Sequence, residues 1–254
     1  MKIRAIAFNT FKEAIRDRIL YVLLFFSVAC IIFSRVLALL TVGDRVKVIK
    51  DVGLASISIF GVLIAILIGT GLVYKEIEKK TIYTLISKPI HRYQFLLGKF
   101  FGLALTLLII ISLMSLFFLA LVFLHTFSVE WKLLLAIYFI YIELLFITAM
   151  SILFSCFSTP ILSSIFSLSV YLIGHLSWGL EQFINKMPSG FAKCVTQFFY
   201  IFLPDLEKFN FRTEVVHNLP IPNEFFLYST LYGLALTLFV LALATLIFRK
   251  RDFI

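Results

Sequence analysis

The sequence predicts an all-α integral membrane protein with six transmembrane helices, preceded by an amphipathic helix at the membrane interface. Hydrophobic residues make up 61% of the 254 residues, against roughly 45–50% in soluble domains. Charged residues make up only 15%, against a norm of about 25%. The apolar residues also gather in runs of about 20 residues or more, which is the length that crosses a bilayer. A soluble fold, a disordered chain and a disulfide scaffold are therefore excluded.

The first element, residues 1–18, is predicted to be an amphipathic helix and not a span. Apolar residues repeat there at helical spacing, and charged residues occupy the other side. The apolar stripe consists of Ile3, Ile6, Ala7, Thr10, Phe11, Ala14 and Ile15. Such a helix lies in the cytoplasmic interface, held by apolar burial and by anionic lipid. The alternative is a polar lead-in without regular structure.

Six apolar runs follow, and each is long enough to span the membrane. They cover residues 19–40, 52–74, 95–124, 131–157, 161–178 and 225–248. The third and fourth runs exceed the thickness of a bilayer, so their ends should project or tilt. No cleavable signal peptide is expected, because the first run starts late and lacks a small-residue exit.

The Lys and Arg residues between the runs set the orientation. With the N-terminus inside, 14 of them lie on the cytoplasmic side and 8 on the outer side. Because cytoplasmic loops carry the excess of basic residues, both termini are predicted to be cytoplasmic, in a prokaryotic inner membrane. The net charge of +9 is attributed to this membrane surface, and nucleic-acid binding is not expected.

The cytoplasmic connection of residues 74–99 is too polar for lipid and too apolar for a free loop. It holds a helical stripe of Ile77, Thr81, Thr84 and Leu85. Pro89 ends that helix, because proline lacks an N–H and restricts the residue before it. Composition alone favours two interpretations equally, a helix that docks on a cytoplasmic partner and a loop that rests on lipid headgroups.

The outer loop, residues 179–224, mixes charges with aromatic residues. Its aromatic stripe consists of Phe191, Val195, Phe198, Phe199 and Phe202. We expect short interfacial helices that cap an external vestibule or pack on the spans.

Two charges lie at membrane depth. Arg35 is near the outer end of the first run and can snorkel, whereas Glu143 is close to mid-membrane. A buried carboxylate is costly, so Glu143 should face protein or water. It either makes a structural hydrogen bond or relays protons. The spacing of His125, His175, His217 and Cys194 fits no metal site, and no metal is expected.

Small residues repeat at packing distance in two spans. They are Ser58, Gly61, Ala65 and Gly69 in the second span, and Ser163, Ser167, Tyr171 and Gly174 in the fifth. These stripes either line a path at a dimer axis or pack within the chain. Gly98 and Gly102 form a separate G-x-x-x-G pair, which is a weak signal of close helix packing.

The whole chain resembles the membrane subunit of an ABC-2 type transporter, in its NosY-like branch. The resemblance is carried by the segment after the second span, with Glu76, Glu78, Thr81, Leu85, Ser87, Pro89, Arg92, Leu96, Leu97, Gly98 and Lys99. Many family members carry Gly where this chain has Lys80. The outer stretch 203–217 and the C-terminal FRKRDF also match the pattern.

The resemblance implies an ABC-2 exporter fold that forms one transmembrane domain over residues 1–254. It implies a homodimer in membrane lipid that couples to two cytoplasmic ABC ATPase subunits, with a periplasmic accessory protein as a further candidate partner. The coupling segment would be residues 75–94. Its expected contacts are Glu76, Ile77, Glu78, Thr81, Leu85, Pro89 and Arg92.

The chain is not expected to be an enzyme, because it contains no G-x-x-x-x-G-K-[ST] phosphate loop. ATP and Mg²⁺ are expected in the partner ATPase, and no cofactor in this chain. Two alternatives stay open, a gradient-driven secondary transporter that uses Glu143 and a membrane assembly factor without transport. An amphiphilic or lipid-linked cargo is favoured, because the sequence indicates no charged pocket.

Overall fold

The computed structural model describes residues 2–41, 43–78, 91–127, 130–186, 193, 203–220 and 223–250. Within these ranges the chain is helical and contains no β-strand. The long helices are α1 (Lys2–Ile15), α2 (Arg18–Leu40), α3 (Arg45–Glu78), α5 (Arg92–Thr126), α6 (Trp131–Ser155), α7 (Pro160–Lys186) and α10 (Asn223–Lys250). Two short helices, η1 (Glu207–Phe209) and α9 (Arg212–Val216), lie between α7 and α10.

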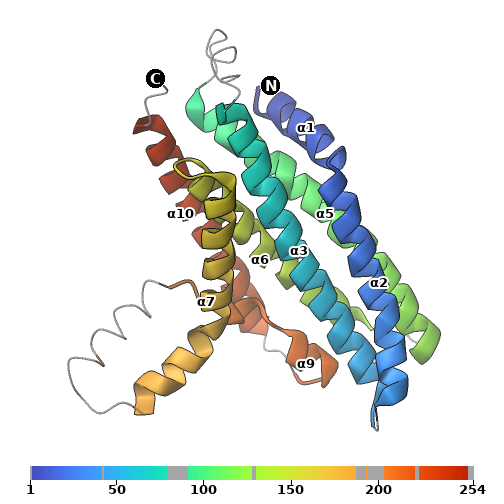
Figure 1. Cartoon of the computed structure of the whole chain (residues 1–254). Helices are drawn as coiled ribbons and strands as arrows, with labels where there is room; N and C mark the ends of the chain where they lie inside the picture. Colours follow the sequence, from blue (N-terminus) through green and yellow to red (C-terminus); the bar gives the residue numbers. More distant parts are fainter. Residues whose placement is uncertain are drawn as a thin grey trace.

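Six of these helices, α2, α3, α5, α6, α7 and α10, are long and apolar enough to cross a membrane. They coincide with the six predicted spans, so the all-α multi-pass membrane fold is confirmed. Helices α3 and α5 are longer than the spans predicted for them, because each continues past its apolar run at both ends. The start of α1 and the end of α10 lie at the same end of the bundle (Figure 1), as an even number of spans requires.

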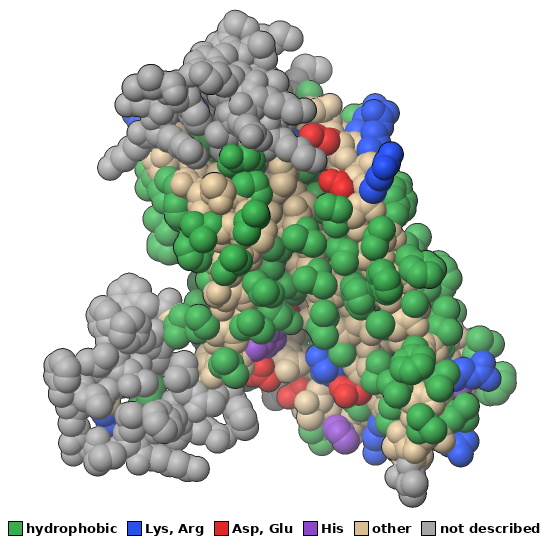
Figure 2. Space-filling view, in the orientation of Figure 1, with side chains coloured by type: hydrophobic (Ala, Val, Ile, Leu, Met, Phe, Trp, Pro, Cys, Tyr) green, Lys and Arg blue, Asp and Glu red, His purple; other side chains and the backbone are tan. Residues whose placement is uncertain are grey.

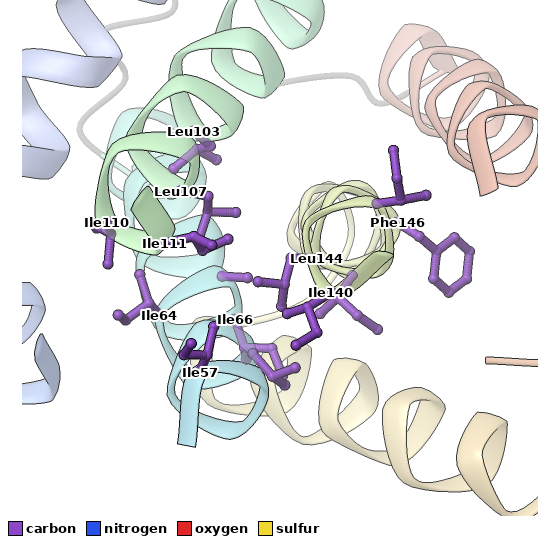
Figure 3. Packing of buried hydrophobic residues seen from close by; sticks show 14 of the residues in the cluster. Ile57, Ile64, Ile66, Leu103, Leu107, Ile110, Ile111, Ile140, Leu144 and Phe146 are labelled. Atoms are coloured by element: carbon purple, nitrogen blue, oxygen red, sulfur yellow. The ribbon is translucent and has the colours of Figure 1, made fainter. Parts of the chain in front are cut away.

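The centre of the bundle is formed by α3 and α6. In α3 and α6, 67% of the most apolar stretch of the helix is buried inside the protein. In α2 and α7 only 22% of that stretch is buried. Helices α2, α5 and α7 pack on α3, and α5, α7 and α10 pack on α6. Figure 3 shows Leu107 and Ile111 of α5 pointing toward Leu144 of α6 in the core. Because lipid tails are as apolar as these side chains, close van der Waals packing is what holds the helices together.

The outer helices present apolar side chains away from the protein. Phe25 of α2 is 68% exposed, and Leu116 of α5 and Leu238 of α10 are equally exposed. Figure 2 shows hydrophobic side chains over most of this face. Such surfaces suit lipid, which satisfies apolar side chains without a protein partner.

The N-terminal helix α1 packs against the first turns of α5. Gly98 and Gly102 make this contact possible, because an added Cβ would lie 2.6 Å from Cγ2 of Ile6 and 2.5 Å from the Ala7 carbonyl oxygen. The G-x-x-x-G pair therefore forms the surface of α5 on which α1 packs. The helix predicted for residues 1–18 is confirmed as Lys2–Ile15, but part of its apolar stripe rests on protein, where the sequence favoured lipid.

Candidate functional site

A charged cluster inside the bundle joins α6, α7 and η1. Nε2 of His175 lies 2.8 Å from Oε1 of Glu143, and Nδ1 of His175 lies 3.2 Å from Oε2 of Glu207. Glu143 is only 2% exposed, and a carboxylate at that depth is costly without a partner. His175 supplies the partner. We call Glu143, His175 and Glu207 the carboxylate–histidine cluster.

The cluster has a defined proton count. A hydrogen bond at each ring nitrogen needs one proton between imidazole and each carboxyl group. Two protons shared by one histidine and two carboxyl groups leave a net charge of −1, whether they form an imidazolium or a neutral imidazole beside one protonated acid. The carboxylate–histidine cluster is therefore anionic in either proton arrangement.

The part of the outer loop that contains η1 and α9 packs into the bundle. The Leu206 N–H donates to the Gly174 carbonyl of α7 at 3.2 Å. Gly174 permits this approach, because an added Cβ would lie 2.5 Å from Cγ of Leu206. The Phe211 ring stacks on Phe139 of α6, with 4.2 Å between centroids. This packing, and not the local sequence, carries Glu207 to His175.

The carboxylate–histidine cluster borders a cavity of about 350 Å³. Its polar wall consists of Ser58, Glu143, Tyr171, His175, Asn210 and Arg212, and its apolar wall of Leu54, Ile59, Ala136, Ile140, Leu172, Phe209 and Phe211. A volume of about 300–1,000 Å³ with a few convergent polar groups is typical of ligand pockets. Figure 2 shows a histidine among acidic and basic side chains low on this face, between α7 and α9.

Two further contacts organise the charges at the cavity. The hydrogen bond from His175 lowers the pKa of Glu207 below its ordinary value of 4.5, against the opposing effect of burial, and a bond from Asn210 adds to the lowering. Arg212 Nη1 lies 3.6 Å from Oδ1 of Asp51 on α3. Arg212 also faces Glu207, so Arg212, Asp51 and the carboxylate–histidine cluster form one group of charges with a net charge of −1.

Hydroxyl groups join α7 to the central helices. Ser58 meets the Tyr171 hydroxyl at 3.4 Å, Thr70 meets Ser164 at 3.0 Å, and Ser151 donates to Ser167 at 3.3 Å. The glycines of the second-span stripe contact α6, because an added Cβ at Gly61 would lie 2.6 Å from Leu144 and at Gly69 3.2 Å from Ser151.

Both predicted small-residue stripes therefore make contacts within the chain in this conformation. Ala65, Ser163 and Ser167 are also buried. A role at a dimer axis stays a prediction.

The predicted ATPase contacts fall into three groups. Thr81, Leu85 and Pro89 lie outside the described residues. Glu76, Ile77 and Glu78 form the last turn of α3. Arg92 makes a contact that the sequence did not predict, because its Nη1 donates to the carbonyls of Phe248 and Arg249 at 3.0 and 2.9 Å. It thus binds the C-terminal end of α10, where carbonyls lack helical partners.

The remaining candidate residues do not converge. Arg35 lies exposed on α2, and Cys194 and all five residues of the aromatic stripe lie outside the described residues. Among the described residues, no group of three or more His, Cys, Asp or Glu side chains is placed to hold a metal ion. His175 binds carboxyl groups, and Nδ1 of His125 lies 3.2 Å from the carbonyl of Leu121 in its own helix.

Sequence reasoning missed the charged pocket. It singled out Glu143 and His175 separately, but gave Glu207 and Arg212 no role. One signal was available, since an acid at mid-membrane demands a partner and His175 lies in the fifth predicted span. Glu207 could not be found in this way, because no rule of spacing brings an outer loop into the bundle.

The model of the family described as ABC-2 family transporter protein matches residues 4–253 of the chain. This match runs from α1 through α10. A comparison with curated proteins found no match.

Proposed function

The chain belongs to the ABC-2 family of transporter proteins, and from this premise we propose that it is the permease subunit of an ATP-driven exporter. Two copies would form the membrane unit, and each would dock one cytoplasmic ABC ATPase that binds ATP and Mg²⁺. The observation that carries the proposal is the family match over residues 4–253, on a fold with six apolar helices that can each cross the membrane.

The coupling segment, residues 75–94, is proposed as the contact with the ATPase. It follows α3 and leads into α5, two helices that pack on each other. Helix α3 is continuous over 34 residues, or about 50 Å at 1.5 Å per residue. It runs from the coupling segment to Leu54, Ser58 and Ile59 at the cavity. A displacement of its cytoplasmic end by the ATPase would therefore be transmitted along one continuous helix to the cavity wall. The helix bundle could then alternate between two discrete packings.

Association with the ATPase tests this proposal. Leu85→Asp places a charge where a desolvated anchor is expected, so ATPase association and stimulated hydrolysis should fall at least tenfold. Glu78→Gln changes a rim charge and should alter either quantity only about twofold. Both variants are compared with the parent protein after membrane insertion is verified. Unchanged association and stimulation in a properly inserted Leu85→Asp protein would contradict the coupling assignment.

A gradient-driven transporter is the second candidate, and the carboxylate–histidine cluster favours it because intramembrane acids and histidines mark proton relays. Reconstitution into proteoliposomes separates the two. A flux that requires ATP and the ATPase supports the exporter. A flux driven by a pH gradient alone, and lost in Glu143→Gln, supports the second candidate.

A further inference from the structure

We propose that the cavity between α3, α6 and α7 binds an amphiphile with a protonated primary amine, whose ammonium group contacts Glu143. As a cargo site this inference rests on the proposed exporter function, but the binding itself does not.

The first observation is an available acceptor. Glu143 lines the cavity, and its side chain is only 2% exposed. Its bond to His175 uses Oε1. Within the described residues, Oε2 has no hydrogen-bond partner. Because Glu143 lines the cavity and His175 uses only its other oxygen, Oε2 is well placed to accept a hydrogen bond from a bound ligand.

The second observation is the balance of charge. The carboxylate–histidine cluster carries a net charge of −1. Arg212, which lines the cavity, adds one positive charge, and Asp51, 3.6 Å from Arg212, adds one negative charge, so the whole group carries −1. One monovalent cation would bring the cavity to neutrality. An anionic ligand would have to approach two carboxyl groups, and like charges at short distance in a low-dielectric site repel strongly. The charge therefore selects cations.

The third observation is the position of the cavity mouth. Ile59 of α3 and Leu172 of α7 line the cavity and are 51% and 54% exposed. Both lie within the stretches of α3 and α7 that are long and apolar enough to cross a membrane. The apolar side of the cavity is therefore open between these two helices, which gives a ligand a route from the hydrocarbon. A small hydrated ion would not take that route, whereas an amphiphile already resides there with its polar group near the interface.

The polar and apolar walls of the cavity match the polar head group and the alkyl chain of such a ligand. Oxygen acceptors from Ser58, Glu143 and Tyr171 lie on the polar wall, and Ile140, Phe209 and Phe211 lie on the apolar wall. The ammonium group of a primary amine has three donors, like that of lysine. It would meet the acceptors while the alkyl chain meets the apolar wall. A quaternary ammonium has the charge but no N–H, so it should bind more weakly.

The test uses the purified full chain in nanodiscs of zwitterionic phosphatidylcholine, with tritiated decylamine as the probe and a scintillation proximity readout. We expect saturable binding that unlabelled decylamine displaces best, decyltrimethylammonium less well and decyl sulfate least. Glu143→Gln should weaken decylamine binding by roughly tenfold or more, because the charged acceptor is lost. Glu224→Gln, an exposed acid at the start of α10, is the matched control and should bind as the parent does.

Ile59→Trp provides a second variant, because it narrows the mouth without changing any charge. It should lower binding even if Glu143→Gln fails to fold, which size-exclusion chromatography would detect. The inference is overturned if the parent shows no saturable binding, if decyl sulfate competes as well as decylamine, or if folded variants at both positions bind as the parent does.

The two proposals fail separately, because this assay contains no ATPase. Loss of ATPase association with intact decylamine binding would contradict the exporter function alone. The reverse result would contradict this inference alone.

Discussion

Lys50 and Lys47 lie three residues apart near the start of α3 and show how much the surroundings of a charge matter. Nζ of Lys50 is 2.6 Å from Oε2 of Glu130, and the lysine side chain is only 4% exposed. Nζ of Lys47 is 3.1 Å from Asp44, but those side chains are 44% and 58% exposed. Water screens the second pair and not the first, so the two bridges should differ in energy although their geometries are similar.

Lys50→Ala should therefore destabilise the protein by about 2 kcal/mol, because it leaves Glu130 without its partner in a largely dry site. The matched variant Lys47→Ala should cost at most about 0.5 kcal/mol. Denaturation by SDS titration in mixed micelles measures both values. Equal effects of the two substitutions would contradict the difference in burial.

Glu207 gives the carboxylate–histidine cluster a dependence on pH. Its pKa is lowered in the folded protein by the bond from His175. A lowered pKa contributes stability that is present above the ordinary value of 4.5 and is lost as the pH falls through the lower, folded value. The groups that face it are Glu143, His175, Asn210 and Arg212.

Glu207→Gln removes that contribution. The parent should unfold at a higher temperature than Glu207→Gln at pH 6 to 7, and the difference should shrink toward zero as the pH falls below 4.5. Thermal unfolding in detergent at a series of pH values checks this. A difference that stays constant into the acid range would show that Glu207 acts through packing and not through its charge.

At the scale of elements, the junction of α1 with α5 explains why Gly98 and Gly102 stand near the start of α5. Thr10 and Ala14 of α1 are fully buried, and the Lys99 Nζ on the same surface lies 3.5 Å from Oε2 of Glu13. The glycines remove the side chains that would hold α1 away. Helix α1 is therefore fixed to the N-terminal end of α5, directly after the proposed coupling segment.

Gly102→Ala should displace α1, because the new Cβ would lie 2.5 Å from the Ala7 carbonyl oxygen. We expect a loss of about 1–3 kcal/mol, the usual cost of overpacking, and faster proteolysis within residues 2–15. Gly71→Ala is the matched control, because nothing lies within 4 Å of its added Cβ. That variant should be neutral or more stable by up to about 1 kcal/mol, since Ala favours the helix. Similar losses at both positions would contradict the close contact of α1 with α5.

At the scale of the whole molecule, the bundle has two distinct ends. One end holds both termini and the ends of α3 and α5 that flank the coupling segment (Figure 1). The other end holds the end of α2, the start of α3 and the short helix α9 (Figure 1). The excess of basic residues predicts that the first end is cytoplasmic.

Reporter fusions should follow this polarity. A green fluorescent protein fused after residue 254 should fluoresce, whereas alkaline phosphatase fused there should be inactive. Phosphatase fused after Gly43, in a truncated chain, should be active. Phosphatase activity at residue 254 would invert the topology and move the coupling segment to the wrong side for an ATPase.

The six spans and the N-terminal helix followed from the sequence, because the requirement for apolar length in lipid acts on each segment alone. The six runs became α2, α3, α5, α6, α7 and α10, and the stripe of residues 1–18 became α1. The family match over residues 4–253 confirmed the resemblance that the motifs indicated, while the NosY-like branch stays a prediction.

The tertiary structure alone decided which residues meet. The sequence identified Glu143 as a costly charge, but its partner His175 lies 32 residues away and Glu207 a further 32. It identified stripes of small residues, but not that Gly61 and Gly69 face α6 or that Gly98 and Gly102 receive α1. The physical reason is that burial in lipid constrains every helix on its own, whereas the pairing of faces depends on close packing and on hydrogen bonds between distant segments, and no local pattern encodes either.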